Sequence, residues 1–248
     1  MTARYKRAKR MERGVKQVVA FSGGKDSTAV ALLLHQRGEE FDLLFTPTGN
    51  ELPELAAHMD RVAARVGAKI ITPPNHSLAH WIEEWGALPN NRQRWCTRVI
   101  KIVPCIAYLK QHPGTTLCIG LRADEEERQG LYGEYAHYRY PLREAGMNLD
   151  ATLALCDKYQ LRPSFRTDCA ICPYQRLAEW FWLWRDHLDL WTQGETWEAT
   201  TGHTFRSARR DTWPAAMKDL RARFEAGDVP ERSLKNMERD ARCKVCSM

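Results

Sequence analysis

Long apolar runs are missing from this 248-residue chain. No stretch approaches about 18 consecutive apolar residues, so the sequence predicts no membrane-spanning helix. The basic N-terminus, from Arg4 to Lys16, lacks the apolar segment of a secretory signal. We therefore expect a cytoplasmic protein without a membrane partner. In that compartment the eight cysteines are expected to serve metal, cluster or catalytic chemistry rather than a disulfide framework.

Other absences further restrict the class of protein to which this sequence can belong. The chain has no internal repeat and no low-complexity segment, and none of its eight histidines has metal-ligand spacing to a second ligand. The composition, 44% hydrophobic and 27% charged, is that of an ordinary globular protein. A formal charge of +6, concentrated toward both ends of the chain, is a weak indication of a polyanionic partner such as a nucleic acid. Solvated charge runs are the competing interpretation.

Buried strands and amphipathic helices alternate in the N-terminal two thirds of the chain. The predicted strands are Gln17–Phe21, Phe41–Phe45, Lys69–Thr72 and Thr116–Leu121. The predicted helices are Thr28–Arg37, Leu55–Val66, Val99–Lys110 and Asn148–Gln160. This order predicts an α/β fold with a Rossmann-like parallel sheet and helices on both faces. We place a nucleotide-binding domain at 1–165 and a helical, cysteine-containing C-terminal region at 166–248, which begins with a helix over Leu177–Trp191.

A glycine loop follows the first predicted strand: Ser22-Gly23-Gly24-Lys25-Asp26-Ser27. A strand, a glycine turn and a helix start direct backbone N–H groups and the positive end of a helix at one point, where a phosphate can bind. The spacing does not match Gly-x-x-x-x-Gly-Lys-Ser/Thr. It resembles the PP-loop of the ATP pyrophosphatase superfamily, which implies cleavage of ATP between its α and β phosphates. A glycine-rich turn without chemistry is the alternative.

Two further loops resemble segments of PP-loop relatives, the sulfonucleotide reductases and the ATP sulfurylase small subunit. Gly120-Leu121-Arg122-Ala123-Asp124-Glu125 is similar to their Gly-x-Arg-x-Asp-Glu segment. Arg122 is expected to hold phosphate, and Asp124 to orient that arginine or to hold Mg²⁺. The Thr48-Gly49 loop is similar to one that borders adenosine, although Pro47 replaces an acid there. A solvated charge run and a plain turn are the respective alternatives.

Three cysteines form the expected metal site. Cys96 lies at a predicted helix start beside Arg94 and Arg98, where its thiolate is expected to be favoured. Its segment resembles the Cys-x-x-x-x-Lys element of sulfonucleotide reductases, in which such a cysteine and a distant Cys-x-x-Cys ligate a [4Fe–4S] cluster. Cys169 and Cys172 supply that pair here.

The sequence alone does not decide which group is the fourth ligand of the cluster. Cys243 or Cys246 could supply it; we assign Cys243 as the ligand and Cys246 as a catalytic thiol. Alternatively the fourth iron has no protein ligand, as in tRNA-thiolating PP-loop enzymes with three cysteines. Zinc in a four-cysteine site is a further alternative. The remaining cysteines, Cys105, Cys118 and Cys156, are predicted to be core residues.

The resemblance favours an ATP-dependent adenylating enzyme in sulfur transfer, similar to the DNA phosphorothioation PP-loop enzyme. Lys25, Asp26 and Arg122 are the expected catalytic residues, with a nucleic acid as a candidate acceptor and a cysteine desulfurase as a candidate sulfur donor. One alternative is a sulfonucleotide (PAPS or APS) reductase that uses a C-terminal cysteine. The other is a non-catalytic nucleotide-binding module with structural zinc.

Overall fold

A computed structural model describes residues 17–125, 135, 137–163, 166–207 and 209–234. Cys243 and Cys246, to which the sequence assigns roles, lie outside this range. The chain forms two units. Unit 1 comprises 1–46, 54–74 and 104–165, and unit 2 comprises 47–53, 75–103 and 166–248. The sequence predicts one boundary after residue 165, whereas two segments from the N-terminal part belong to unit 2.

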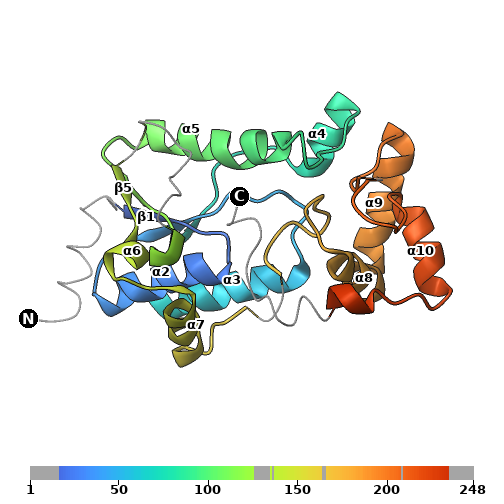
Figure 1. The fold of residues 1–248 in the computed structure, drawn as a ribbon. Coiled ribbons are helices and arrows are strands. Elements are labelled where there is room, and N and C mark those ends of the chain that lie inside the picture. The colour runs from blue at the N-terminus through green and yellow to red at the C-terminus, as the bar shows by residue number, and fades with distance from the viewer. Residues whose placement is uncertain (1–16, 126–134, 136, 164–165, 208, 235–248) are drawn as a thin grey trace, which may run out of the picture. The chain divides into compact units, whose positions relative to one another are not determined.

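Unit 1 is an α/β body, as predicted (Figure 1). Its strands are β1 (Gln17–Ala20), β2 (Asp42–Leu44), β3 (Ile70–Ile71), β4 (Thr116–Cys118) and β5 (His137–Arg139). Its helices are α2 (Lys25–Gln36), α3 (Pro53–Val66), α5 (Val103–Gln111), η2 (Ala123–Glu125), α6 (Pro141–Glu144) and α7 (Leu149–Lys158), with the first residues of α3 and α5 belonging to unit 2.

The five strands form a parallel sheet in the order β3-β2-β1-β4-β5. The chain winds outward from β1 to β3 and then returns to place β4 on the other side of β1. This reversal makes the carboxyl ends of β1 and β4 a topological switch point, where doubly wound sheets bind their ligands. The glycine loop follows β1 and the arginine loop follows β4, so both meet at that point.

Alternate residues of β1 face opposite sides of the sheet, and each side has its own core. Val19 packs with residues of α2, α3 and α7, whereas Val18 packs with Cys105 and Leu109 of α5. Figure 1 shows α5 on one side of the sheet and α2, α3 and α7 on the other. The prediction of helices on both faces is confirmed. The same cores bury Cys105, Cys118 and Cys156, as predicted.

Unit 2 is helical, with α4 (Leu78–Trp85), a π-helix at Thr97–Ile102, α8 (Leu177–Asp186), α9 (Leu188–Thr201) and α10 (Met217–Glu225). Aromatic rings fill its C-terminal part: Phe224 contacts Phe181, Trp184, Trp191 and Trp213. Most of the tryptophan-rich segment is therefore packing, as the sequence indicates. The single helix predicted over Leu177–Trp191 is wrong, because the backbone at His187 (φ −138°, ψ 63°) ends α8 and begins α9.

Several described elements were not predicted, among them β5, α6 and α4. The edge strand β5 carries polar residues, and α6 has only one turn. Helix α4 begins at Ser77, whose side chain accepts a hydrogen bond from the His80 amide, and ends at Gly86. Among the described residues, no helix is long and apolar enough to cross a membrane.

Candidate functional site

The glycine loop turns directly from β1 into the N-terminus of α2. Gly23 adopts φ +72°, and a Cβ there would lie 2.5 Å from Leu55 Cδ1, so only glycine fits. Thr28 N donates the first helical hydrogen bond, to Gly24 O (2.9 Å). The amides that precede Thr28 therefore begin the helix without an intrahelical acceptor, which is the arrangement that binds phosphate.

The hydroxyl groups of this loop brace its backbone. Ser27 Oγ donates to Gly24 O (3.1 Å) and accepts from Ser22 N (3.3 Å). Ser22 Oγ lies 3.3 Å from Ser27 Oγ and accepts from Gly24 N (3.4 Å). Both serines were predicted to bind the cofactor. In the structure they hold the loop in the shape that presents its amides.

A buried ion-pair network joins the two loops at the switch point. Asp26 places one carboxylate oxygen 3.2 Å from Lys25 Nζ and the other 3.0 Å from an Arg122 guanidinium nitrogen. Arg122 also contacts Asp124 (2.9 Å) and Glu125 (3.6 Å). Lys25, Asp26 and Arg122 are each no more than 7% exposed. Buried charges of this kind are retained only when they are paired.

The arginine loop is fixed in place by close packing and by α6. A Cβ on Gly120 would lie 3.0 Å from the Asp26 carbonyl carbon and 3.1 Å from Ser27 N, so the loop touches the backbone at the start of α2. Arg143 donates to the carbonyls of Arg122 and Glu125. Burial acts to lower the pKa of Arg122, but the contacts with Asp26 and Asp124 raise it, so the guanidinium stays charged.

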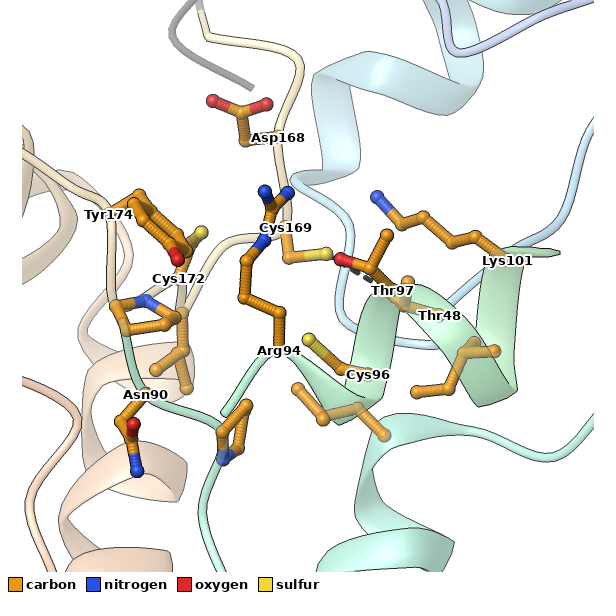
Figure 2. A pocket seen from close by; sticks show the side chains of 15 residues that line it. Thr48, Asn90, Arg94, Cys96, Thr97, Lys101, Asp168, Cys169, Cys172 and Tyr174 are labelled. Carbon is orange, nitrogen blue, oxygen red and sulfur yellow. Dashed lines mark hydrogen bonds between the residues drawn. The ribbon is translucent and has the colours of Figure 1, made fainter. Parts of the chain in front are cut away.

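The second cluster of candidate residues lies wholly within unit 2. Cys96, Cys169 and Cys172 line one pocket, and the Thr48 hydroxyl lies there too, 3.4 Å from Cys169 Sγ. Figure 2 shows the Arg94 side chain between Cys172 and the other two cysteines, and the Lys101 side chain extending toward Cys169 from the opposite side. Among the described residues, no three His, Cys, Asp or Glu side chains are arranged to hold a single metal ion. Thr48, predicted at the nucleotide, is thus a neighbour of the cysteines.

A π-helical turn brings Lys101 to this pocket. Val103 N donates to Arg98 O, five residues earlier, and the π-helix spans Thr97–Ile102. In an α-helix, residues five apart lie on different faces. The wider turn instead brings Cys96 and Lys101 to one side, and π-turns are frequent at functional sites. The cysteines Cys169, Cys172 and Cys96, when they are ionised, raise the pKa of Lys101, and so does Asp168.

Burial changes the expected electrostatics of the thiols. The sequence predicts a thiolate favoured at Cys96, and this prediction is wrong. Burial and the neighbouring Cys169 raise the pKa of Cys96, and the same causes raise that of Cys172 to about 12. Without a bound cation, these thiols are therefore protonated at neutral pH. Binding of a metal or cluster would release their protons.

Hydrogen bonds to its backbone carbonyl groups, donated by two arginine side chains, hold the Cys-x-x-Cys loop in place. Arg166 donates to Cys169 O (2.6 Å) and Ala170 O (3.3 Å). Arg210 donates to Pro173 O (2.9 Å) and Tyr174 O (3.4 Å). On the opposite side, Ala170 N donates to Asn50 O (2.6 Å). The loop that follows β2 therefore supports the cysteines directly.

The structure thus separates the predicted residues into two groups. Ser22, Gly23, Gly24, Lys25, Asp26 and Ser27 lie together with Gly120, Arg122 and Asp124 in unit 1. Cys96, Cys169, Cys172 and Thr48 lie together in unit 2. Sequence reasoning missed Asp168 as a pocket residue, and it matched Lys101 only as the last residue of the Cys-x-x-x-x-Lys element, without a site role. The five-residue spacing from Cys96 to Lys101 was the available signal, but it places both on one face only in a π-turn.

Comparisons with known proteins agree with the loop chemistry. Residues 16–132 match the model of the phosphoadenosine phosphosulfate reductase domain. An uncharacterised protein of Methanocaldococcus jannaschii is 28% identical over 93 residues, which are 38% of this chain and only 22% of that relative.

Two solved structures resemble the chain, each with a TM-score of 0.47. One is a phosphoadenylyl-sulfate reductase from Candida auris in complex with phosphate (14% identity, 63% of this chain and 78% of that one). The other is the U34-tRNA thiolase NcsA from Methanococcus maripaludis with its [4Fe–4S] cluster (16% identity, 85% and 81%). At these scores neither bears on what this chain does. The domain match covers just under half of the chain. Together with the glycine loop, it supports a relationship to the phosphoadenosine phosphosulfate reductase-like superfamily of PP-loop proteins.

Proposed function

We propose that this protein is an ATP-dependent adenylating enzyme that transfers sulfur with the help of a cysteine-bound iron–sulfur cluster. The observation that carries the proposal is the buried network of Lys25, Asp26 and Arg122 at the start of α2. Such a concentration of charge at a switch point fits a polyphosphate, because the phosphates can replace Asp26 as the partner of both cations.

In the adenylation step, an acceptor oxygen attacks the α-phosphorus of ATP and pyrophosphate leaves. The amides of the first turn of α2 and the Lys25 ammonium stabilise the negative charge that develops on the departing pyrophosphate. Arg122 is placed to hold a phosphate oxygen once it exchanges its carboxylate partner. The Asp124 side chain, 43% exposed, is more open to Mg²⁺ than Asp26 or Glu125.

The donor set of the second pocket fits an iron–sulfur cluster. Cys96, Cys169 and Cys172 would hold it, and thiolate sulfur is the ligand that such clusters require. The Lys101 ammonium would offset the negative charge of the thiolates. When bound, the cluster would supply a site for sulfur delivery. Cys243 stays the proposed fourth ligand and Cys246 the proposed additional thiol, and zinc is the competing occupant.

Substitution of Lys25 tests the adenylation step. We expect Lys25→Ala to release AMP and pyrophosphate from ATP at least about 100-fold more slowly, the usual effect of removing one donor to a developing charge. Labelled ATP and a coupled pyrophosphate assay measure both products. Lys69→Ala, at an exposed lysine of the same unit, should match the wild type. Full pyrophosphate release by Lys25→Ala, with an unchanged circular dichroism spectrum, would refute the proposal.

Metal analysis tests the cluster independently. We expect protein purified without oxygen to contain about four iron and four sulfide per chain, with a broad absorption band near about 400 nm. Alanine at Cys96, Cys169 or Cys172 should remove most of both, whereas Cys105→Ala, in the core of unit 1, should keep them. Zinc alone, or a full iron content in all three variants, contradicts this assignment.

A further inference from the structure

An arginine-lined hollow of about 390 Å³ opens on the surface of unit 2. It is lined by Arg92, Arg206, Arg209, Asn90 and Asn91, together with one threonine and one serine hydroxyl. No carboxylate is among the lining residues. The side chains are thus three cations and four neutral polar groups, a set that suits an anion with several acceptor oxygens, such as phosphate.

Part of the donor set is already used, because Thr204 Oγ1 donates to Arg206 O (2.7 Å) and the Arg206 guanidinium donates to Pro214 O and to Asp211. Other donors remain available to a ligand. Asn90 Oδ1 accepts from the amides of Arg92 and Gln93 (2.9 Å each), so the remaining NH₂ group is the part that can serve a ligand. Arg206 is only 2% exposed, pairs with Asp211 (2.8 Å), and keeps an Nε–H without a hydrogen-bond partner among the described residues. A buried donor of this kind points to a ligand or an ordered water.

Aromatic rings flank the same loop. Residues 86–94 connect Trp85, which ends α4, to Trp95, and the two rings are in edge contact with centroids 5.0 Å apart. Trp85 is 44% exposed and also contacts Trp81. An exposed tryptophan can stack on a base, provided that the base is not already stacked within a duplex.

The hollow adjoins the cysteine pocket. Asn90 lines both, and the Asn91 carbonyl accepts a hydrogen bond from Tyr174, a pocket residue (2.8 Å). The Arg94 guanidinium lies over the Tyr174 ring, 4.9 Å from its centroid, as Figure 2 shows for the two labelled side chains. A strand whose phosphates occupy the hollow would therefore pass the mouth of the pocket.

We propose that this hollow and Trp85 bind single-stranded nucleic acid, with phosphates at Arg92 and Arg209 and a base on the Trp85 ring. The role of this surface, presenting an acceptor to the cysteine pocket, rests on the proposed function; the binding itself does not. Arg92 and Arg209 are exposed and are the side chains free to follow a backbone, whereas Arg206 forms the fixed floor.

Fluorescence anisotropy with a labelled, mixed-sequence 20-nucleotide single strand, in the full-length protein and without ATP, tests this surface. We expect the R92A/R209A double variant to bind about tenfold more weakly and to lower the slope of log Kd against log salt by about 1.4, since each single-strand phosphate contributes about 0.7. Trp85→Ala should weaken binding about tenfold and leave the slope unchanged.

The matched control is R162A/R185A, which removes the same charge from two exposed arginines paired with Asp157 and Asp186. It should bind like the wild type. Equal binding by R92A/R209A and this control overturns the proposal, and so does stronger competition by duplex than by single strand. Displacement of the probe by inorganic phosphate at an equal phosphate concentration would instead make the hollow a small-anion site. Because ATP is absent, a failure of adenylation cannot imitate any of these results.

Discussion

Glu198 has a buried carboxyl group. Its oxygens accept hydrogen bonds from Phe205 N (3.0 Å) and Met217 N (2.6 Å), which join α9 to the segment leading into α10. Burial raises the pKa of Glu198 to about 7, and the two amide hydrogen bonds only partly oppose that effect. The folded protein therefore binds a proton at this site that the unfolded chain has already lost at pH 6.

This difference predicts a stability that falls as the pH rises. Below about pH 4.5 both states are protonated, so the contribution of Glu198 is greatest there; it is lost as the pH passes about 7, and amounts to about 3 kcal/mol. Glu198→Gln should remove this dependence, gaining stability relative to wild type between pH 5 and 8. Urea unfolding followed by tryptophan fluorescence measures the difference. An identical pH dependence in both proteins would contradict the prediction.

At the scale of elements, local sequence signals predicted some of the helices and strands, whereas others were not predicted. The apolar run before Gly23 predicted β1, because a parallel strand that is buried on both faces consists of a nearly continuous run of apolar residues. Helix α4 was missed although the sequence displays a Ser77 cap, a Gly86 end and apolar residues at helical spacing, Leu78, Trp81, Ile82 and Trp85. The π-turn after Cys96 is set by hydrogen bonds to residues five apart, and no local residue preference specifies it.

The contact between the arginine loop and α2 is an element-scale feature with a direct test. In Gly120→Ala the added methyl would meet backbone atoms of Asp26 and Ser27 at 3.0 and 3.1 Å, so the loop must move away from the helix start. We expect a loss of about 1–3 kcal/mol in stability and at least a tenfold slower pyrophosphate release, since Arg122 moves with the loop.

Gly194→Ala is the matched control, because its methyl would crowd Met217 within unit 2. It should reduce stability without slowing pyrophosphate release. If both variants release pyrophosphate at the wild-type rate, the close approach at Gly120 does not position Arg122.

At the scale of the whole molecule, the sequence predicted the residues of the candidate sites but not how the chain divides them between two units. The order of strands and helices was sufficient for the sheet and for the loops at its switch point. Residues 47–53 and 75–103 follow strands of the sheet, so they read as loops of an α/β domain. Their long-range contacts instead place them in unit 2. Thr48, which the sequence predicts beside adenosine, lies 3.4 Å from Cys169 Sγ in unit 2.

This division predicts that the two candidate sites can be lost separately. All nine tryptophans lie in unit 2, whereas Lys25 and Arg122 lie in unit 1 with its own cores. In a C169A/C172A variant we expect tryptophan fluorescence to report unfolding several degrees lower, because a bound cluster adds to the stability of the unit that holds it. ATP affinity, measured by calorimetry, should stay within about twofold of wild type, because the amides and cations of unit 1 are unchanged. A parallel loss of ATP affinity would show instead that the cysteine loop shapes the nucleotide site, and the two chemistries would then have to be treated as one site.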